Sequence, residues 1–135
     1  MVLVDTSVLI GFLKGHTSSK VALFQEVLRR DVPFGISAYT YQEVLQGARD
    51  EAELEILKSY LSTQRIYHLR PEAATYEKAA VLYFSLRRQG ITPRSTLDML
   101  IALTAIECDL ALLHDDRDFD AMAERIAELR TLDTL

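Results

Sequence analysis

Brief apolar runs alternate along the chain with longer segments in which apolar residues recur every three or four positions. The brief runs predict buried strands, and the periodic segments predict helices with one apolar face. Strands are expected at residues 2–4, 33–37, 65–69 and 110–114, with a possible last strand at 129–132. Helices are expected at residues 7–15, 20–31, 39–48, 51–62, 71–90, 95–108 and 119–126.

The order of these elements predicts the fold class. Short apolar strands separated by helices are typical of an α/β protein, in which helices cover both faces of a parallel sheet. No internal repeat, low-complexity tract or linker divides the chain. Residues 1–135 are therefore expected to form a single domain.

Composition agrees with one globular domain in a reducing compartment. The chain has 135 residues, of which 49% are hydrophobic and 26% charged, and its single cysteine excludes an internal disulfide. The N-terminus has no basic region, and Asp5 interrupts its apolar stretch, so no signal peptide is expected. The longest mostly apolar run, at 99–106, is shorter than the ~20 residues of a membrane span. We expect a cytoplasmic protein without a membrane partner.

Acidic residues follow the predicted strands or open the helices beside them. Ligands of open α/β sheets bind outside the carboxyl ends of the strands, so acids at these places are expected to face one edge of the sheet. The candidates are Asp5 after the first strand, Glu43 and Asp98 early in their helices, and Asp115, Asp116 and Asp118 after the strand at 110–114. Convergent carboxylates suit Mg²⁺ or Mn²⁺, and without an ion they would raise one another's pKa.

Each acid also has a structural interpretation. Asp5 and the two residues after it are good N-cap residues, and Thr40 to Glu43 fits a capping box. Asp98 would also be favourable at the positive end of a helix, and an acid after residue 114 would be a suitable helix cap. Four acids at one predicted edge nevertheless favour a common site.

Other chemistries have less support. His16, His68 and His114 lack metal-ligand spacing and are expected at the surface or at strand ends. The five glycines form no phosphate-binding loop, and neither Ser7 nor Cys108 has a base at a recognisable spacing.

Four segments resemble the PIN-domain nucleases, most closely the VapC-like toxin ribonucleases of bacterial and archaeal toxin–antitoxin modules. They occur in the family's order and spacing and extend over the whole chain. The segments are VDTSVLI (4–10), EVLQGA (43–48), LDMLIALTA (97–105) and LLHDDRDFD (112–120).

The resemblance assigns site residues. The family's acids fall on Asp5, Glu43, Asp98 and Asp116, with Asp115 and Asp118 as rivals for the fourth place. Its small hydroxyl residue corresponds to Thr6 or Ser7, which would orient a carboxylate or a water. Gly47 matches a family glycine, and its missing side chain would allow close packing on that helix.

The resemblance also implies a function. It implies an α/β/α sandwich and a Mg²⁺-dependent endoribonuclease, with Mn²⁺ as a substitute. Attack by a metal-activated hydroxide in line with the leaving 3′ oxygen would give 5′-phosphate and 3′-hydroxyl ends. The four acids would hold the ion. Such toxins usually form homodimers, and a VapB-type antitoxin inhibits them by laying its C-terminal tail, with a basic residue, across the acidic groove.

The net charge of −5 argues at first against a nucleic-acid partner. Setting the four site acids aside from the 20 acidic residues leaves a near balance with the 15 basic ones. Arg87, Arg88 and Arg94 could then meet RNA phosphates, and Arg94, just before the Asp98 helix, is the best placed. A pair such as Arg87 and Arg88 more often lies on a solvated helix face, so the sequence allows RNA binding without demanding it.

Two other functions remain open. The chain could be a non-catalytic PIN-like module that binds RNA or protein, although such a module has no need of all four acids. A DNA-directed nuclease is the less favoured alternative, because the chain shows no additional DNA-gripping element.

Overall fold

The structure is a computed structural model that describes residues 1–135. Its strands are β1 (Val2–Val4), β2 (Phe34–Ser37), β3 (Arg65–Tyr67) and β4 (Ala111–Leu113). Its helices are α1 (Thr6–Leu13), α2 (Ser19–Arg29), α3 (Ala38–Gln46), α4 (Glu51–Leu61), α5 (Ala73–Arg88), α6 (Thr96–Glu107) and α7 (Arg117–Arg125). The four main strands and all seven helices predicted from the sequence are confirmed, with shifts at their ends. None of the helices combines the length and apolar character that crossing a membrane requires.

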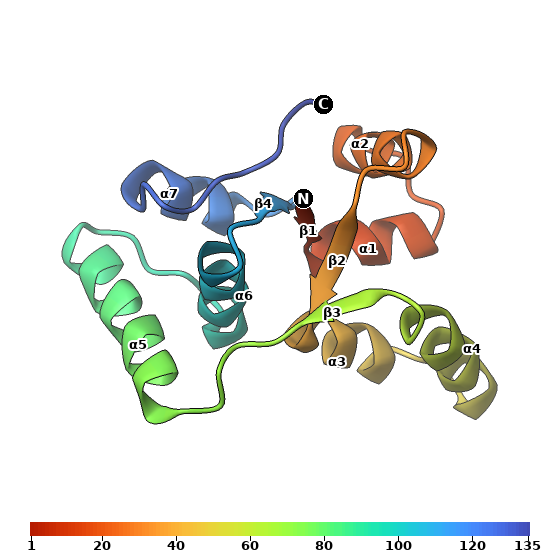
Figure 1. Ribbon diagram of the computed structural model, residues 1–135, viewed down its shortest axis with the longest axis horizontal. Helices are drawn as coiled ribbons and strands as arrows, with labels where there is room; N and C mark the ends of the chain where they lie inside the picture. Colours follow the sequence, from red (N-terminus) through yellow and green to blue (C-terminus); the bar gives the residue numbers. More distant parts are fainter.

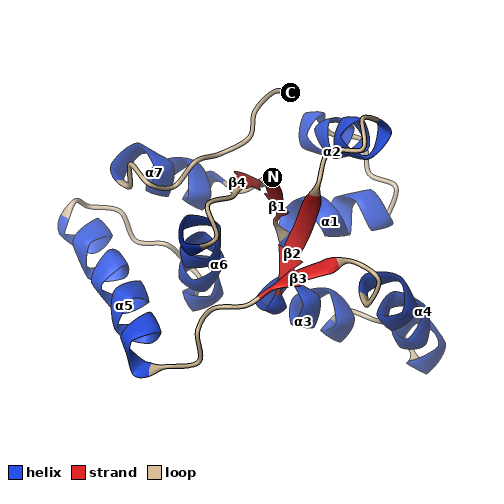
Figure 2. Ribbon diagram, in the orientation of Figure 1, coloured by secondary structure: helices blue, strands red, loops and turns tan.

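The four strands form one sheet in the order β3-β2-β1-β4, and every neighbouring pair is parallel. β1 is an inner strand: Leu3 lies opposite Gly35 on one side and Leu112 on the other. Helices cover both faces of the sheet, as Figures 1 and 2 show. The predicted α/β class, with an α/β/α sandwich, is confirmed.

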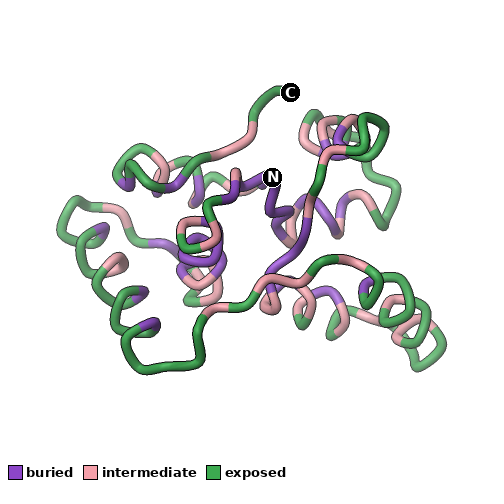
Figure 3. The backbone as a smooth tube through the Cα atoms, in the orientation of Figure 1, coloured by how far each residue is buried: buried purple, intermediate pink, exposed green.

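Two apolar cores lie on opposite faces of this sheet. Side chains of successive strand residues point to opposite faces, so Leu3 joins one core while Val2 and Val4 join the other. The core of Leu3 is built with residues of α5, α6 and α7, and the core of Val2 with residues of α1 to α4. Figure 3 shows the buried positions gathered along β1, β2 and α6.

Helix N-termini gather at the carboxyl edge of the sheet. α1 begins directly after Asp5, α3 directly after Ser37, and α7 directly after Asp116, and each of these residues accepts a backbone N–H as an N-cap. α6 leads back into β4, so its first turn also lies at this edge. The fold thereby brings four segments that are distant in sequence to one place.

The possible strand at 129–132 is wrong as a regular strand. Only one isolated parallel bridge joins Thr131 to Leu112, supported by hydrogen bonds from Leu112 N to Arg130 O (2.8 Å) and from Leu132 N to Leu112 O (2.9 Å). The chain after Leu132 makes no backbone hydrogen bond to β4, so the pairing stops at this one bridge.

The packing expected around Gly47 is also wrong. Gly47 is exposed at the C-cap of α3, and a Cβ there would meet only ordinary contacts, the nearest at 3.5 Å. The close approach occurs at Gly35 in β2 instead. A Cβ on Gly35 would lie 2.5 Å from Tyr67 Cε2 and 2.6 Å from Arg65 O of the neighbouring strand.

We therefore expect Gly35→Ala to destabilise the protein, because a backbone oxygen of β3 cannot move aside without disturbing the sheet. The loss should be about 1–3 kcal/mol in the free energy of unfolding, the range for overpacked cores. Gly47→Ala is the matched control and should stay within about 0.5 kcal/mol of wild type. Urea denaturation of the three proteins measures both effects, and equal stability of Gly35→Ala and wild type would contradict this packing.

Candidate active site

Asp5 is a buried carboxylate at the end of β1. Its backbone N–H donates to Leu113 O (2.8 Å), which fixes the residue against β4. Only 4% of the residue is exposed. Its Oδ2 accepts hydrogen bonds from Ser7 N (3.1 Å) and Ser7 Oγ (2.6 Å), whereas its Oδ1 is buried without a hydrogen-bond partner. Burial raises the pKa of Asp5, and the bonds from Ser7 oppose that rise.

Two hydroxyl residues that follow Asp5 connect it with the other acidic segments. The Ser7 hydroxyl, besides donating to Asp5, accepts the backbone N–H of Asp115 (3.0 Å). The Thr6 hydroxyl donates to Glu43 Oε1 (2.7 Å). Because one hydroxyl contacts the α3 acid and the other the loop after β4, both predicted positions lie beside site carboxylates.

The capping-box interpretation of Glu43 is wrong. α3 begins at Ala38, and its cap is Ser37, whose hydroxyl accepts the Thr40 backbone N–H (3.0 Å). Thr40 is therefore already inside the helix, and Glu43 lies one turn further on. Its carboxylate bonds the Thr6 hydroxyl across the carboxyl edge of the sheet.

Asp98 lies in the first turn of α6, behind the cap Ser95. Burial, followed by the negative charges of Asp5, Asp116, Glu43 and Asp118, raises its pKa to about 7. A helix N-terminus by itself would favour the ionised form and lower the pKa. The neighbouring acids and the loss of water therefore outweigh the helix end at Asp98.

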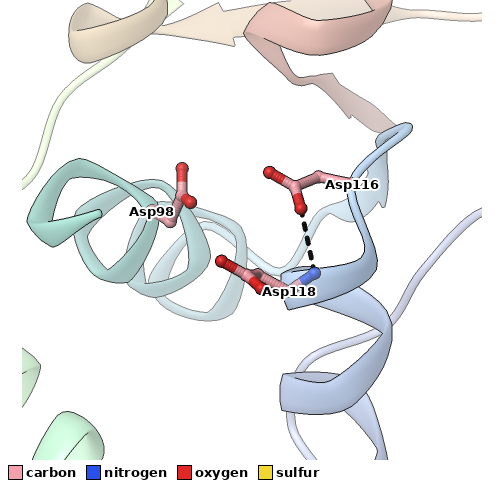
Figure 4. Close-up of side chains that lie close together, drawn as sticks. All are labelled: Asp98, Asp116 and Asp118. Carbon is pink, nitrogen blue, oxygen red and sulfur yellow. Dashed lines mark hydrogen bonds between the residues drawn. The ribbon is translucent and has the colours of Figure 1, made fainter. Parts of the chain in front are cut away.

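Asp116 and Asp118 open α7 beside Asp98. Asp116 is the N-cap, and its Oδ1 accepts the Asp118 backbone N–H (2.9 Å). One carboxylate oxygen from each of Asp98, Asp116 and Asp118 lies within 4.8 Å of the others (Figure 4). The sequence could not choose among the three acids after β4; in the structure Asp116 and Asp118 join this group, and Asp115 is exposed outside it.

His114 supports this loop from inside the protein. The expected strand-end position is confirmed, but the residue is only 1% exposed. Its Nδ1 accepts the Asp116 backbone N–H (3.2 Å), while its Nε2 has no hydrogen-bond partner. Burial lowers the pKa of the imidazole. Its place directly after the apolar strand segment LALL was the sequence signal for this burial.

The three predicted arginines differ in their positions. Arg94 reaches the acids, because its side chain bonds Asp118 Oδ2 (3.1 Å) and Asp116 Oδ1 (3.2 Å). Arg87 and Arg88 are exposed in the last turn of α5, and their guanidinium carbons lie 5.7 and 5.6 Å from the centre of the Phe84 ring. Neither makes an ion pair within 4.0 Å, so the structure does not bring them to the acidic group.

The pKa of Asp98 predicts an unusual pH dependence of stability in the absence of metal ions. The folded state holds this proton to about pH 7, whereas an ordinary aspartate loses it near 3.8. The contribution of this raised pKa to the free energy of unfolding is therefore fully present below about pH 4, and it is lost as the pH rises through about 7. Asp98→Asn stays neutral, so its melting temperature should equal or exceed that of wild type at about pH 8, and this gain should vanish near pH 5.

Asp115→Asn is the control for this measurement and should show no such pH-dependent gain, because Asp115 lies outside the acidic group. If Asp98 served only the helix end, Asp98→Asn would instead lose about 0.3–1 kcal/mol at pH 8. Thermal melts of the three proteins in EDTA separate these outcomes.

Comparison with known proteins agrees with this geometry. Residues 2–125 match the family model of the PIN domain. Ribonuclease VapC11 of Mycobacterium tuberculosis and VapC ribonuclease Mb1587 of Mycobacterium bovis are each 31% identical to the chain over 134 residues, 96% of the chain and 96% of each relative. VapBC2 from Rickettsia felis, solved with a DNA fragment from its promoter, has a chain with a TM-score of 0.73 at 21% identity, covering 98% of both chains. The chain therefore belongs to the PIN domain family and, within it, to the VapC group.

Proposed function

We propose that the protein is a Mg²⁺-dependent endoribonuclease, the toxin of a type II toxin–antitoxin module, and that it hydrolyses RNA phosphodiester bonds in the cytoplasm. One observation carries the proposal: Asp98 feels the charges of acids from three other segments at the carboxyl edge of the sheet, and one of these acids, Asp5, keeps a buried oxygen without a partner. The 31% identical relatives bear the name ribonuclease, which supports the reaction type.

The residues fit a divalent cation. Asp5 Oδ1 is a buried acceptor that no protein donor satisfies, and a buried carboxylate oxygen in that state is unfavourable unless a cation or a water meets it. Asp98 is crowded by four other acids, which an ion would relieve. Carboxylate oxygens are the ligands that Mg²⁺ and Mn²⁺ prefer.

Asp5, Asp98, Asp116 and Glu43 are the proposed ligands. A bound Mg²⁺, or Mn²⁺ in its place, supplies an activated water and neutralises charge on the phosphate in the transition state. Asp118 is held by the backbone N–H and the side chain of Arg94, and these bonds lower its pKa. We therefore assign Asp118 to the support of the site and keep Asp116 as the fourth ligand.

Thr6 and Ser7 are positioning residues in this proposal. Ser7 holds Asp5 Oδ2 with two donors, while Oδ1 keeps no hydrogen-bond partner. Thr6 holds one oxygen of Glu43 and leaves the other without a side-chain donor. Each hydroxyl thus fixes one oxygen of a carboxylate and leaves one for the ion, as supporting groups of metal ligands do.

RNA phosphates are the proposed partners of Arg87, Arg88 and Arg94. Arg87 and Arg88 are exposed and have no acidic partner, so they are available to a phosphate. Arg94 is paired with Asp116 and Asp118 and must leave them first. Contacts of this kind would make RNA binding salt-dependent.

A VapB-type antitoxin and a second copy of the chain are the proposed protein partners. The solved VapBC structures with this fold support the first partner. Two exposed apolar pairs support protein contacts: Ile56 and Tyr60 lie one turn apart on α4, and Val81 and Phe84 lie about one turn apart on α5, with Val81 65% exposed. Large exposed apolar side chains that lie together are typical of interaction sites.

The alternative is a non-catalytic PIN-like module that binds RNA or protein. Such a module gains nothing from a buried unpaired carboxylate oxygen or from an aspartate whose pKa lies near 7. Both features are unfavourable without an ion, so the structure favours the nuclease. A cleavage assay distinguishes the two.

We expect the purified protein to cleave RNA with Mg²⁺ or Mn²⁺ and to lose cleavage in EDTA. Because an ion that binds only the folded state stabilises it, Mn²⁺ should also raise the melting temperature. Asp98→Asn and Asp116→Asn should lose both effects, while Asp115→Asn should keep them. Cleavage that persists undiminished in EDTA would refute the metal-dependent mechanism.

Co-expression tests the partner. We expect the small protein encoded next to this chain's gene to form a stable complex with it and to relieve its toxicity in growing cells. Asp98→Asn should bind the same protein without being toxic alone, which separates binding from protection. A neighbour that neither binds nor protects would remove the toxin–antitoxin assignment but leave the nuclease assignment in place.

A further inference from the structure

Arg94 is a cation placed directly on the acidic group. It lies in the segment between α5 and α6, four residues before Asp98. Its Nη2 donates to Asp116 Oδ1 (3.2 Å), and its Nε donates to Asp118 Oδ2 (3.1 Å). The Arg94 side chain is 72% exposed, whereas its two partners are 25% and 20% exposed. The arginine therefore covers the acids from the solvent side.

No other lysine or arginine shares this position. Among all ion pairs within 4.0 Å, only those of Arg94 involve the acidic group of Asp98, Asp116 and Asp118, and none involves Asp5 or Glu43. Without metal ions, Arg94 thus makes every ion pair of the group, and Arg117 adds only a smaller charge effect at Asp118. Its removal would leave Asp116 and Asp118 without a cationic side chain beside the ionisable Asp98.

We propose that Arg94 is a built-in counter-cation, which competes with the divalent ion for the proposed ligand Asp116 while it is also paired with Asp118, and so sets how much metal the site requires. This inference rests on the proposed function, since it concerns the ion of that site. A divalent ion at the acids would repel the guanidinium and would seek the Asp116 carboxylate that the guanidinium holds. Both effects weaken metal binding for as long as Arg94 remains in place.

The contacts allow Arg94 to give way without disturbing the fold. Exposed ion pairs contribute little to stability, so the guanidinium can leave at small cost. The segment itself stays anchored, because the Arg94 backbone N–H donates to Asp118 Oδ2 (3.0 Å), a bond that needs no side chain. The movable part of Arg94 is thus its side chain, and the anchored part is its backbone.

A scaffold role would give the opposite result. If the guanidinium held Asp116 and Asp118 in the geometry that metal requires, its removal would weaken metal binding. Competition predicts that removal strengthens it. The sign of the change in metal affinity therefore distinguishes the two roles, and this measurement needs no RNA.

The experiment is calorimetric titration of the RNA-free protein with Mn²⁺. Arg94→Gln should bind Mn²⁺ about three- to tenfold more tightly than wild type at low salt, the range expected when two exposed competing ion pairs are lost. The gain should shrink at about 0.5 M salt, because exposed charges are screened there. Arg94→Lys keeps the positive charge but loses the planar guanidinium with its several donors, so its gain in Mn²⁺ affinity should be smaller than that of Arg94→Gln.

Arg49→Gln is the matched control, because Arg49 makes an exposed pair with Glu53 (2.7 Å) outside the acidic group. It should bind Mn²⁺ as wild type does, and all variants should melt near the wild-type temperature. The proposal would be overturned if Arg94→Gln bound Mn²⁺ no more tightly than wild type, or if it failed to fold. In either case, Mn²⁺ binding by the wild-type protein would still support the metal site. If wild type itself binds no Mn²⁺, the proposed function fails, and this inference fails with it.

Discussion

The burial of the Asp5 carboxylate is the constraint on which the site depends. β1 is hydrogen-bonded on both sides within a parallel sheet, so the residue that follows it has no freedom to turn toward solvent. Ser7 satisfies one carboxylate oxygen and leaves the other buried without a donor. An unpaired buried acceptor is unfavourable. The charge of Asp5 also acts on Asp98 at the start of α6, whose pKa it helps to raise.

Crowding of like charges is the second consequence. Asp98 lies among acids from three other segments, and burial together with their charges holds its pKa near 7. Arg94 partly offsets this repulsion from the solvent side, and the backbone N–H groups at the start of α7 offset it from within. The metal-free site is therefore a balance of repulsion, burial and one exposed cation. Such a balance is readily changed by a divalent ion.

Capping and chemistry are compatible at this edge. Asp5 and Asp116 are N-caps of α1 and α7, and both are also proposed metal ligands, because helix starts and strand ends meet at the carboxyl edge. A carboxylate has two oxygens, so one can serve the helix while the other serves an ion. Glu43 differs, since Ser37 takes the cap of its helix and Glu43 bonds Thr6 instead.

Apolar periodicity in the sequence determined the α/β class and the order of strands and helices, because apolar spacing is a local property. The positions of the acids after predicted strands led to the prediction that they lie at one edge of the sheet. The resemblance added which four acids to choose. Three things were decided only by tertiary structure: that Asp118 rather than Asp115 joins Asp98 and Asp116, that Arg94 is paired with acids, and that the segment at 129–132 makes a single bridge. Each depends on contacts between residues far apart in sequence. Neighbouring residues of the same chemical type point in different directions once the backbone turns, and the sequence alone does not show which of them makes the contact.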